Sequence, residues 1–385
     1  MNRRKFIIGS GAFVTMVSLS SYSYIELGKD LKREKIKRPN PNNFKEPILK
    51  AIAYGVSASN PHNTQAWKFK IVNELELLLF IDATRILPET DPTTRQIHIG
   101  CGCFLETASI GMTQEGFASK IYYFPEGDYE KKELGTLPIA KLILKKNINV
   151  ISSNLNTVLL HRKTSRLQFS DDVISNSTWK NILELIGYKH NEIQLFTDVQ
   201  FLSKIKPILS EGMKIESYCY RTNEESRKWF RENDDRIESK RDGINLPGNG
   251  IFGIKKWFAE KKLKGLESKE WNNKKTINYT LKSHDKKVTS STNIITIKSK
   301  TNTMLDWVKA GQDYTRLQLA CLANDFFTHP LSQVLQEFEE MKTLRKKFKK
   351  SMQVKENEKI QMVVRVGKSK EPYFSYRRRI NDMVM

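Results

Sequence analysis

The chain has 385 residues, enough to bury a large core in one to three domains, and a hydrophobic content of 39%, which is ordinary for a globular protein. Its net charge is +22. Its four cysteines are too few for a disulfide scaffold, so the class of small disulfide-stapled proteins is excluded.

The composition of residues 1–23 predicts a targeting segment rather than part of the fold. Arg3 and Arg4 are paired, and an apolar run of about 14 residues, too short to span a bilayer, extends from Phe6 to Leu19. This composition is typical of a twin-arginine export signal. Ser21-Tyr22-Ser23 is a weak signal-peptide cleavage site, so the alternative that the segment is retained as a membrane anchor stays open. Both interpretations predict export to the periplasm or cell envelope by the twin-arginine translocase.

Residues 24–45 predict a charged linker rich in proline and asparagine, and helices and strands follow it. Helices are predicted over residues 47–54, 102–116, 157–162, 178–186, 304–327 and 331–352. Strands are predicted over residues 75–81, 139–144, 192–196, 293–297 and 360–366, and another is indicated at Trp67 and Phe69. Segments 97–117 and 307–327 share a glycine near the start of an apolar helix, which indicates a faint internal repeat.

A group of amide and imidazole side chains precedes the strand that begins at Trp67. Asn60, His62, Asn63 and Gln65 stand in a loop marked by a proline. Such groups can form hydrogen bonds with a flat ligand rich in heteroatoms. The plainer interpretation of the same residues is an asparagine-rich turn before an edge strand.

The spacing of His98, Cys101 and Cys103 superficially resembles a set of metal ligands. A structural zinc site needs four ligands, and no second cluster is near in the sequence. We therefore predict no metal here and interpret the segment as a helix start made of small residues.

Positive charge gathers in two regions of the sequence. Residues 240–300 contain 15 Lys and Arg against 5 Asp and Glu, and residues 342–379 contain 14 against 3. The excess is mostly scattered lysine, and no nucleic-acid-binding module accompanies it, so we predict a solvated basic face and no nucleic-acid partner. The run Arg377 to Arg379 differs, because adjacent guanidinium groups can bind a phosphate.

Six blocks, in sequence order, resemble the Acg-like branch of the FMN-dependent nitroreductase family. They cover roughly residues 46 to 384. The blocks are Asn60 to Phe69, Asp91 to Arg95 running into Gly100-Cys101-Gly102, His161 to Arg166, Arg241-Asp242-Gly243, Ala310-Gly311-Gln312, and Arg365-Val366-Gly367 with Arg377-Arg378.

The resemblance implies an α+β fold with three α/β/α layers. It implies two pseudo-repeated nitroreductase-like halves in one chain, residues 46–150 and 151–385, so that a monomer takes the place of a dimer and holds the flavin between its halves. Residues 212–290 are highly charged, and we interpret them as a basic, largely helical insertion that is able to cover the flavin face.

The resemblance also implies FMN as the cofactor. The phosphate would be bound by Arg162, Thr164, Arg166, Arg377 and Arg378, and the ring edge by Asn60, His62, Asn63 and Gln65. Gly311 and Gln312, at a helix start, would lie near the flavin N5 atom. None of these residues is predicted to be catalytic, because the flavin carries the redox chemistry.

The implied function is an FMN-dependent oxidoreductase that passes two electrons to nitro, quinone or similar small-molecule acceptors by a ping-pong cycle. The identity of the electron donor stays open between NAD(P)H and a donor of the cell envelope. Because the twin-arginine route moves folded proteins, the export signal agrees with a cofactor loaded in the cytoplasm. Two alternatives stay open: an exported protein that sequesters FMN with little turnover, and a basic envelope-binding module without flavin.

Overall fold

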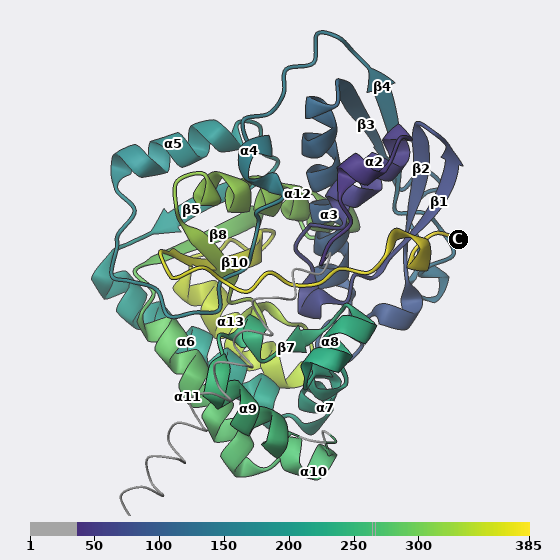
Figure 1. The fold of residues 1–385 in the computed structure, drawn as a ribbon. Coiled ribbons are helices and arrows are strands. Elements are labelled where there is room, and N and C mark those ends of the chain that lie inside the picture. The colour runs from purple at the N-terminus through teal and green to yellow at the C-terminus, as the bar shows by residue number, and fades with distance from the viewer. Residues whose placement is uncertain (1–36, 264, 266) are drawn as a thin grey trace, which may run out of the picture.

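The computed structural model describes residues 37–263, 265 and 267–385 (Figure 1). The predicted targeting segment and the linker up to residue 36 lie outside the described residues. None of the described helices combines the length and the apolar character that a membrane span requires.

Two antiparallel four-stranded sheets organise the described chain (Figure 1). The first has the strand order β1-β2-β4-β3 and consists of β1 (Trp67–Asn73), β2 (Glu76–Ile81), β3 (Phe117–Tyr123) and β4 (Ala140–Lys146). The second has the order β5-β8-β10-β9 and consists of β5 (Glu192–Phe196), β8 (Asn293–Ser299), β9 (Phe327–Pro330) and β10 (Lys359–Gly367). The strands of the two sheets thus lie on opposite sides of residue 150 in the sequence.

The helices α3 (Arg95–Gln114) and α12 (Met304–Leu322) pack against each other in the centre of the molecule (Figure 1). They meet at two glycines. A Cβ atom added to Gly102 would collide with the carbonyl oxygen of Val308, and one added to Gly311 would collide with the carbonyl oxygen of Ile99. The backbones of the two helices therefore approach as closely as only glycine permits.

The remaining helices surround this centre. α2 (Pro47–Gly55) packs on α3, and α5 (Asn176–Ile186) packs on α12. α4 (Asn156–Leu159) is one turn, and α13 (Lys342–Ser351) packs on α6 (Val199–Tyr218). The predicted insertion extends from the end of α6 through further helices, namely α7 (Tyr220–Lys228), α8 (Asp234–Lys240), α9 (Gly253–Lys262), α10 (Ser268–Trp271) and α11 (Lys274–Thr289). A short parallel pair, β6 (Phe230–Arg231) and β7 (Ile244–Asn245), lies between them.

The C-terminal segment crosses from the second sheet to the first, as the yellow chain in Figure 1 shows. At its end it pairs with the outer edge of β1. The backbone nitrogen of Phe69 donates to the carbonyl of Met383 over 2.8 Å, and the nitrogen of Met385 donates to the carbonyl of Phe69 over 2.9 Å. The last residues therefore cover an edge that a free strand would leave open.

The mixed α+β class expected from the sequence is confirmed, while several element boundaries need correction. The helix predicted over 102–116 begins at Arg95, and the helix predicted over 304–327 ends at Leu322, before β9. The helix predicted over 331–352 is two 3₁₀ turns, Gln333–Leu335 and Glu339–Met341, followed by α13. The helix predicted over 157–162 ends at Leu159, and β3 was not predicted.

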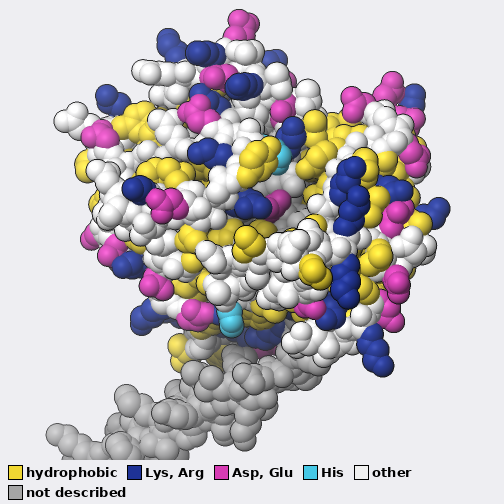
Figure 2. Space-filling model, turned by 90° about the horizontal axis from the view of Figure 1, so that it is seen from above, with side chains coloured by type: hydrophobic (Ala, Val, Ile, Leu, Met, Phe, Trp, Pro, Cys, Tyr) yellow, Lys and Arg dark blue, Asp and Glu magenta, His cyan; other side chains and the backbone are white. Residues whose placement is uncertain are grey.

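Basic side chains are spread over the visible face of the molecule. Figure 2 shows Lys and Arg in small groups among acidic and hydrophobic side chains, with no continuous basic stripe on that face. Such a distribution is typical of a solvated basic face.

Candidate functional site

A cavity with a volume of ≈ 910 Å³ lies where the two halves of the chain and the insertion meet. Its walls come from the loop at Ser59 to Asn63, the segment from Arg162 to Arg166, the C-terminal segment near Arg377, and insertion residues between Met213 and Lys287. The volume is in the upper part of the range for small-molecule and cofactor sites.

The cavity lining is strongly cationic. Among the described lining residues there is one carboxylate, Glu216, against six Lys and Arg side chains, namely Arg162, Arg166, Lys255, Lys262, Lys287 and Arg377. An electropositive cavity of this kind favours an anionic ligand.

The loop before β1 has an unusual backbone. His62, Asn63 and Gln65 have φ angles of 46°, 54° and 49°, in the left-handed region that non-glycine residues rarely adopt. Two side-chain contacts hold this conformation: the Oδ1 atom of Asn60 accepts from the backbone nitrogen of Gln65 over 2.8 Å, and Oδ1 of Asn63 accepts from Arg377 over 2.9 Å. Strained backbone held by its surroundings is common at functional sites.

His62 is the most exceptional side chain of this loop. Its Nδ1 atom is buried and has no hydrogen-bond partner among the described residues. Burial, and secondarily the positive charge of Arg166, lowers the pKa of His62 to about 4, so the imidazole is neutral at physiological pH. A neutral ring beside the cavity can donate or accept a hydrogen bond without adding charge.

Arg162 and Arg377 line the cavity but are also tied to the protein. Arg162 donates to the carbonyl of Ser57 over 2.8 Å and to the hydroxyl of Ser59 over 2.9 Å. Arg377 donates to the carbonyls of Val56 and Ala58 over 2.8 and 3.0 Å. The two guanidinium groups therefore fix the chain that leads into the His62 loop, whatever else they bind.

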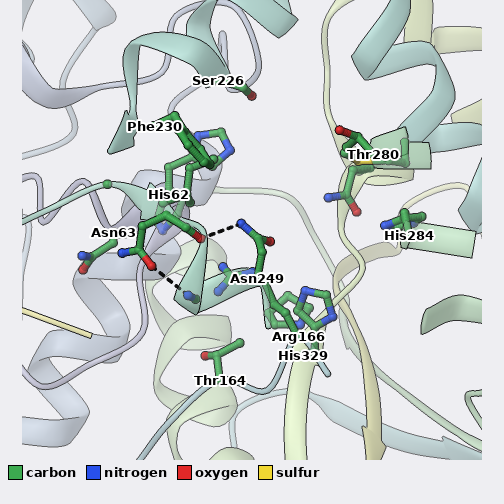
Figure 3. Close-up of a pocket in the computed structure, with 18 of the residues that line it drawn as sticks. His62, Asn63, Thr164, Arg166, Ser226, Phe230, Asn249, Thr280, His284 and His329 are labelled. Carbon is green, nitrogen blue, oxygen red and sulfur yellow. Dashed lines mark hydrogen bonds between the residues drawn. The ribbon is translucent and has the colours of Figure 1, made fainter. Parts of the chain in front are cut away.

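Arg166 differs, because no described residue forms a hydrogen bond or ion pair with its guanidinium group. It lies beside His329, with Thr164 on the same wall of the cavity (Figure 3). The Nε atom of Arg365 donates to Nδ1 of His329 over 2.9 Å, so neutral His329 carries its proton on Nε2. Burial and nearby Arg365 hold the pKa of His329 well below its usual value, which keeps the ring neutral and makes Nε2–H a donor.

Four predicted site residues do not line the cavity. The first two are Gln65 and Arg378. Gln65 donates to the carbonyl of Arg241 and accepts from the backbone nitrogen of Arg378. The side chain of Arg378 donates to the carbonyls of Gln65 and Asp382. Gly311 and Gln312 lie inside α12, whose capped start is at Thr303, so the helix start expected at Ala310 is wrong. Seven predicted residues do line it, namely Asn60, His62, Asn63, Arg162, Thr164, Arg166 and Arg377.

The sequence analysis missed several lining residues. Glu216 is buried with one carboxylate oxygen unpartnered, and burial raises its pKa to about 7. Lys287, His284 and Tyr314 were also missed. No local sequence signal identifies them, because their place in the cavity depends on how the insertion and α12 pack.

His98 and the cysteines do not form a metal site. His98 contacts the carbonyl of Thr94 and the hydroxyl of Tyr129 over 2.7 and 2.6 Å, while Cys101 and Cys103 lie in the hydrophobic core. Within the part of the chain that the structure describes, no three His, Cys, Asp or Glu side chains come together as metal ligands.

No protein-family model matches the chain. It is 28% identical over 125 residues to an uncharacterized protein of Mycobacterium tuberculosis (strain ATCC 25618 / H37Rv), which covers 32% of this chain and 35% of that protein. It is 31% identical over 78 residues to a protein of the same strain named "Putative NAD(P)H nitroreductase acg", covering 20% of this chain and 23% of the other. The chain thus spans about a third or less of the length of these curated relatives.

Solved structures with some likeness include the FMN and NADPH-dependent nitroreductase NfnB from Sphigopyxis sp. strain HMH. It is 9% identical, with a TM-score of 0.38, over 60% of this chain and 98% of that chain. A nitroreductase with bound FMN from Bacteroides fragilis is 11% identical, with a TM-score of 0.32, over 59% and 94% of the two chains.

Proposed function

We propose that the protein is an FMN-dependent oxidoreductase of the nitroreductase type, from the Acg-like branch, that reduces nitro, quinone or similar acceptors. The observation that carries this proposal is the unpartnered guanidinium group of Arg166 in a cationic cavity, next to the strained loop at His62. The names of the partly matching relatives support the same assignment.

The described residues fit both the phosphate group and the ring system of FMN. The phosphate would be held by Arg166, the hydroxyl of Thr164 and Nε2–H of His329. Each of these groups can donate a hydrogen bond to a phosphate oxygen, and none is paired with a carboxylate. Asn60, His62 and Asn63 would lie along the ring edge, where neutral amides and an imidazole match its donors and acceptors. When bound, the flavin supplies the two-electron chemistry, and the chain binds and orients it.

Glu216 would hold a proton inside the cavity. Burial raises the pKa of its carboxyl to about 7, so this group can exchange a proton near neutral pH, as a general acid or base requires. In this proposal it supplies a proton to the reduced acceptor.

A second candidate function is FMN sequestration with little turnover. It is favoured by the insertion, whose residues between Met213 and Lys287 line the cavity and would narrow the access of an acceptor. Stopped-flow reduction by NADPH or dithionite, followed by addition of a quinone or nitroaromatic compound, separates the two. Export of the loaded protein, supported by the paired Arg3 and Arg4, is part of both proposals.

The purified protein is expected to be yellow and to contain about one FMN per chain. The block from His161 to Arg166, which is proposed to bind the phosphate, occurs once in the sequence. The pattern of a glycine near the start of an apolar helix occurs twice, in segments 97–117 and 307–327. Released flavin, quantified against protein, measures the ratio. Failure to take up flavin on reconstitution contradicts the proposed function, and two flavins per chain contradict the single site.

Arg166→Met is expected to weaken FMN binding about 10- to 150-fold, the equivalent of about 1.5–3 kcal/mol for hydrogen bonds to a charged group. Riboflavin, which lacks the phosphate, should bind the variant and the parent equally. Lys163→Met is the matched control, because Lys163 pairs with Glu371 and does not line the cavity. An equal loss of riboflavin and FMN binding would assign Arg166 a structural role instead.

A further inference from the structure

Helix α11 presents one face to the cavity. Thr276, Thr280, His284 and Lys287 lie on it, and successive members are three or four residues apart, so they share one side of the helix. Lys287 is the last of this series and lies two residues before the end of α11. The neighbouring Lys286 is exposed and does not line the cavity.

One buried guanidinium group sets the backbones of Arg166 and Lys287 close together. Arg365 is fully buried and donates to the carbonyls of Ser165 and Leu167 over 3.2 and 2.7 Å, on either side of Arg166. It also donates to the carbonyl of Lys287 over 3.2 Å. Because the planar guanidinium group of Arg365 binds all three carbonyls, the backbone on either side of Arg166 and the backbone of Lys287 are held close together.

The ammonium group of Lys287 has no partner within the described chain. No described residue accepts a hydrogen bond from its Nζ atom or forms an ion pair with it, as is also the case for the Arg166 guanidinium. The carboxylate on the cavity wall, Glu216, belongs to α6. Two unpaired, partly buried cations next to each other repel, so an anionic group that joins them is bound favourably.

We propose that Lys287 of the insertion and Arg166 of the core bind one phosphate group together, that of FMN, so that flavin binding fastens the insertion onto the core. This inference rests on the proposed function. Nε2–H of His329 is a third donor at the same point. Arg365 is a positioning residue, since all three of its guanidinium nitrogens already donate to His329 or to the three carbonyls.

The site predicts a pH dependence of FMN binding. Burial, then the charges of Arg166 and Arg365, lowers the pKa of Lys287 to about 7 in the flavin-free protein. The other titratable groups on the cavity wall are His284, whose pKa burial lowers to about 4, His329, which is also held neutral, and Glu216 of the packed helix α6, whose pKa burial raises to about 7. A bound phosphate dianion favours the charged ammonium and raises its pKa, so binding takes up a proton above pH 7. FMN affinity should therefore fall as pH rises from 7 to 9, by up to about tenfold per pH unit.

Calorimetric titration of the flavin-free, full-length protein with FMN and with riboflavin tests the inference. Lys287→Met should lower FMN affinity at pH 7 by about tenfold or more, leave riboflavin affinity unchanged, and strongly reduce the pH dependence between 7 and 9. Lys286→Met is the control and should match the parent in all three respects. Lys287→Arg should retain FMN affinity at pH 7 and keep it at pH 9, because a guanidinium group does not titrate in this range.

Three outcomes overturn the inference while leaving the proposed function intact. In the first, Lys287→Met binds FMN as tightly as the parent. In the second, riboflavin affinity falls as much as FMN affinity. In the third, inorganic phosphate occupies the site while riboflavin binds beside it as tightly as FMN, which would make free phosphate the ligand. If the parent binds neither FMN nor riboflavin, the proposed function itself is wrong.

Discussion

Replacing Gly102 or Gly311 with alanine is expected to lower the free energy of unfolding by about 3 kcal/mol, at the upper end of the cost of overpacking. The new methyl group would meet a backbone carbonyl of the partner helix, that of Val308 or Ile99. A carbonyl in a helix cannot turn aside as a side chain can, so α3 and α12 would have to separate. Denaturant-induced unfolding, followed by circular dichroism, measures the loss.

Gly100→Ala is the matched control, in the same helix and two residues away. Its new methyl group would lie 3.3 Å from Cβ of Asn60 and Cδ of Pro61, a tight contact that a shift of a few tenths of an ångström relieves, whereas the methyl group at Gly102 would overlap a carbonyl oxygen. Removing a glycine from a helix interior also gains up to about 1 kcal/mol, so this variant should stay within about 1 kcal/mol of the parent. A Gly102→Ala variant as stable as the Gly100→Ala variant would show that α3 and α12 do not cross at this point.

Arg377→Ala is expected to cost about 3–5 kcal/mol of stability in the flavin-free protein. Its guanidinium group is buried and donates to the carbonyls of Val56 and Ala58 and to the side chain of Asn63. Truncation removes the donor from the Val56 carbonyl and from Asn63, and leaves the Ala58 carbonyl only a long hydrogen bond of 3.4 Å from Asn60. Each buried acceptor that loses its partner costs about 1–3 kcal/mol. Arg377→Lys should rescue only part of the loss, since one ammonium group cannot reproduce a planar fork.

Arg379→Ala provides the control for this measurement, because Arg379 is two residues away and exposed. Its truncation should change stability by no more than about 0.5 kcal/mol. Thermal unfolding without flavin separates the structural role of Arg377 from any contribution to cofactor binding. Equal stability of the Arg377→Ala and Arg379→Ala variants would contradict the role assigned to the buried guanidinium group.

Elements with a clear apolar period were predictable from the sequence. β5 has the predicted limits, Glu192–Phe196, and β2 and β8 differ by a few residues at most. β3 was missed because its side chains are mostly half-buried and offer no clean alternation. The start of α3 was misplaced because glycines are unfavourable in helices, whereas here the close approach to α12 requires Gly102.

The candidate site was predictable only in part, because tertiary contacts decide which of its cations are paired with the protein. The block from His161 to Arg166 indicated phosphate binding, but nothing in it separates Arg162 from Arg166. Arg162 donates to Ser57 and Gln318, which are more than 100 residues away in either direction, and Arg166 has no such partner in the described chain. Lys287 is one of 15 cations between residues 240 and 300, and only the tertiary contacts of Arg365 single it out.

The pairing of the C-terminal segment with β1 bears on the order of events during synthesis. Phe69 emerges from the ribosome early, but its strand partners, Met383 and Met385, are translated more than 300 residues later. The same late segment carries Arg377, which fixes the loop at Asn63. The first sheet and the cavity wall beside it therefore cannot be completed before these late residues have been synthesised. Contacts this distant in sequence form slowly, so the nascent chain is expected to need protection of its β1 edge until the C-terminal segment pairs with it.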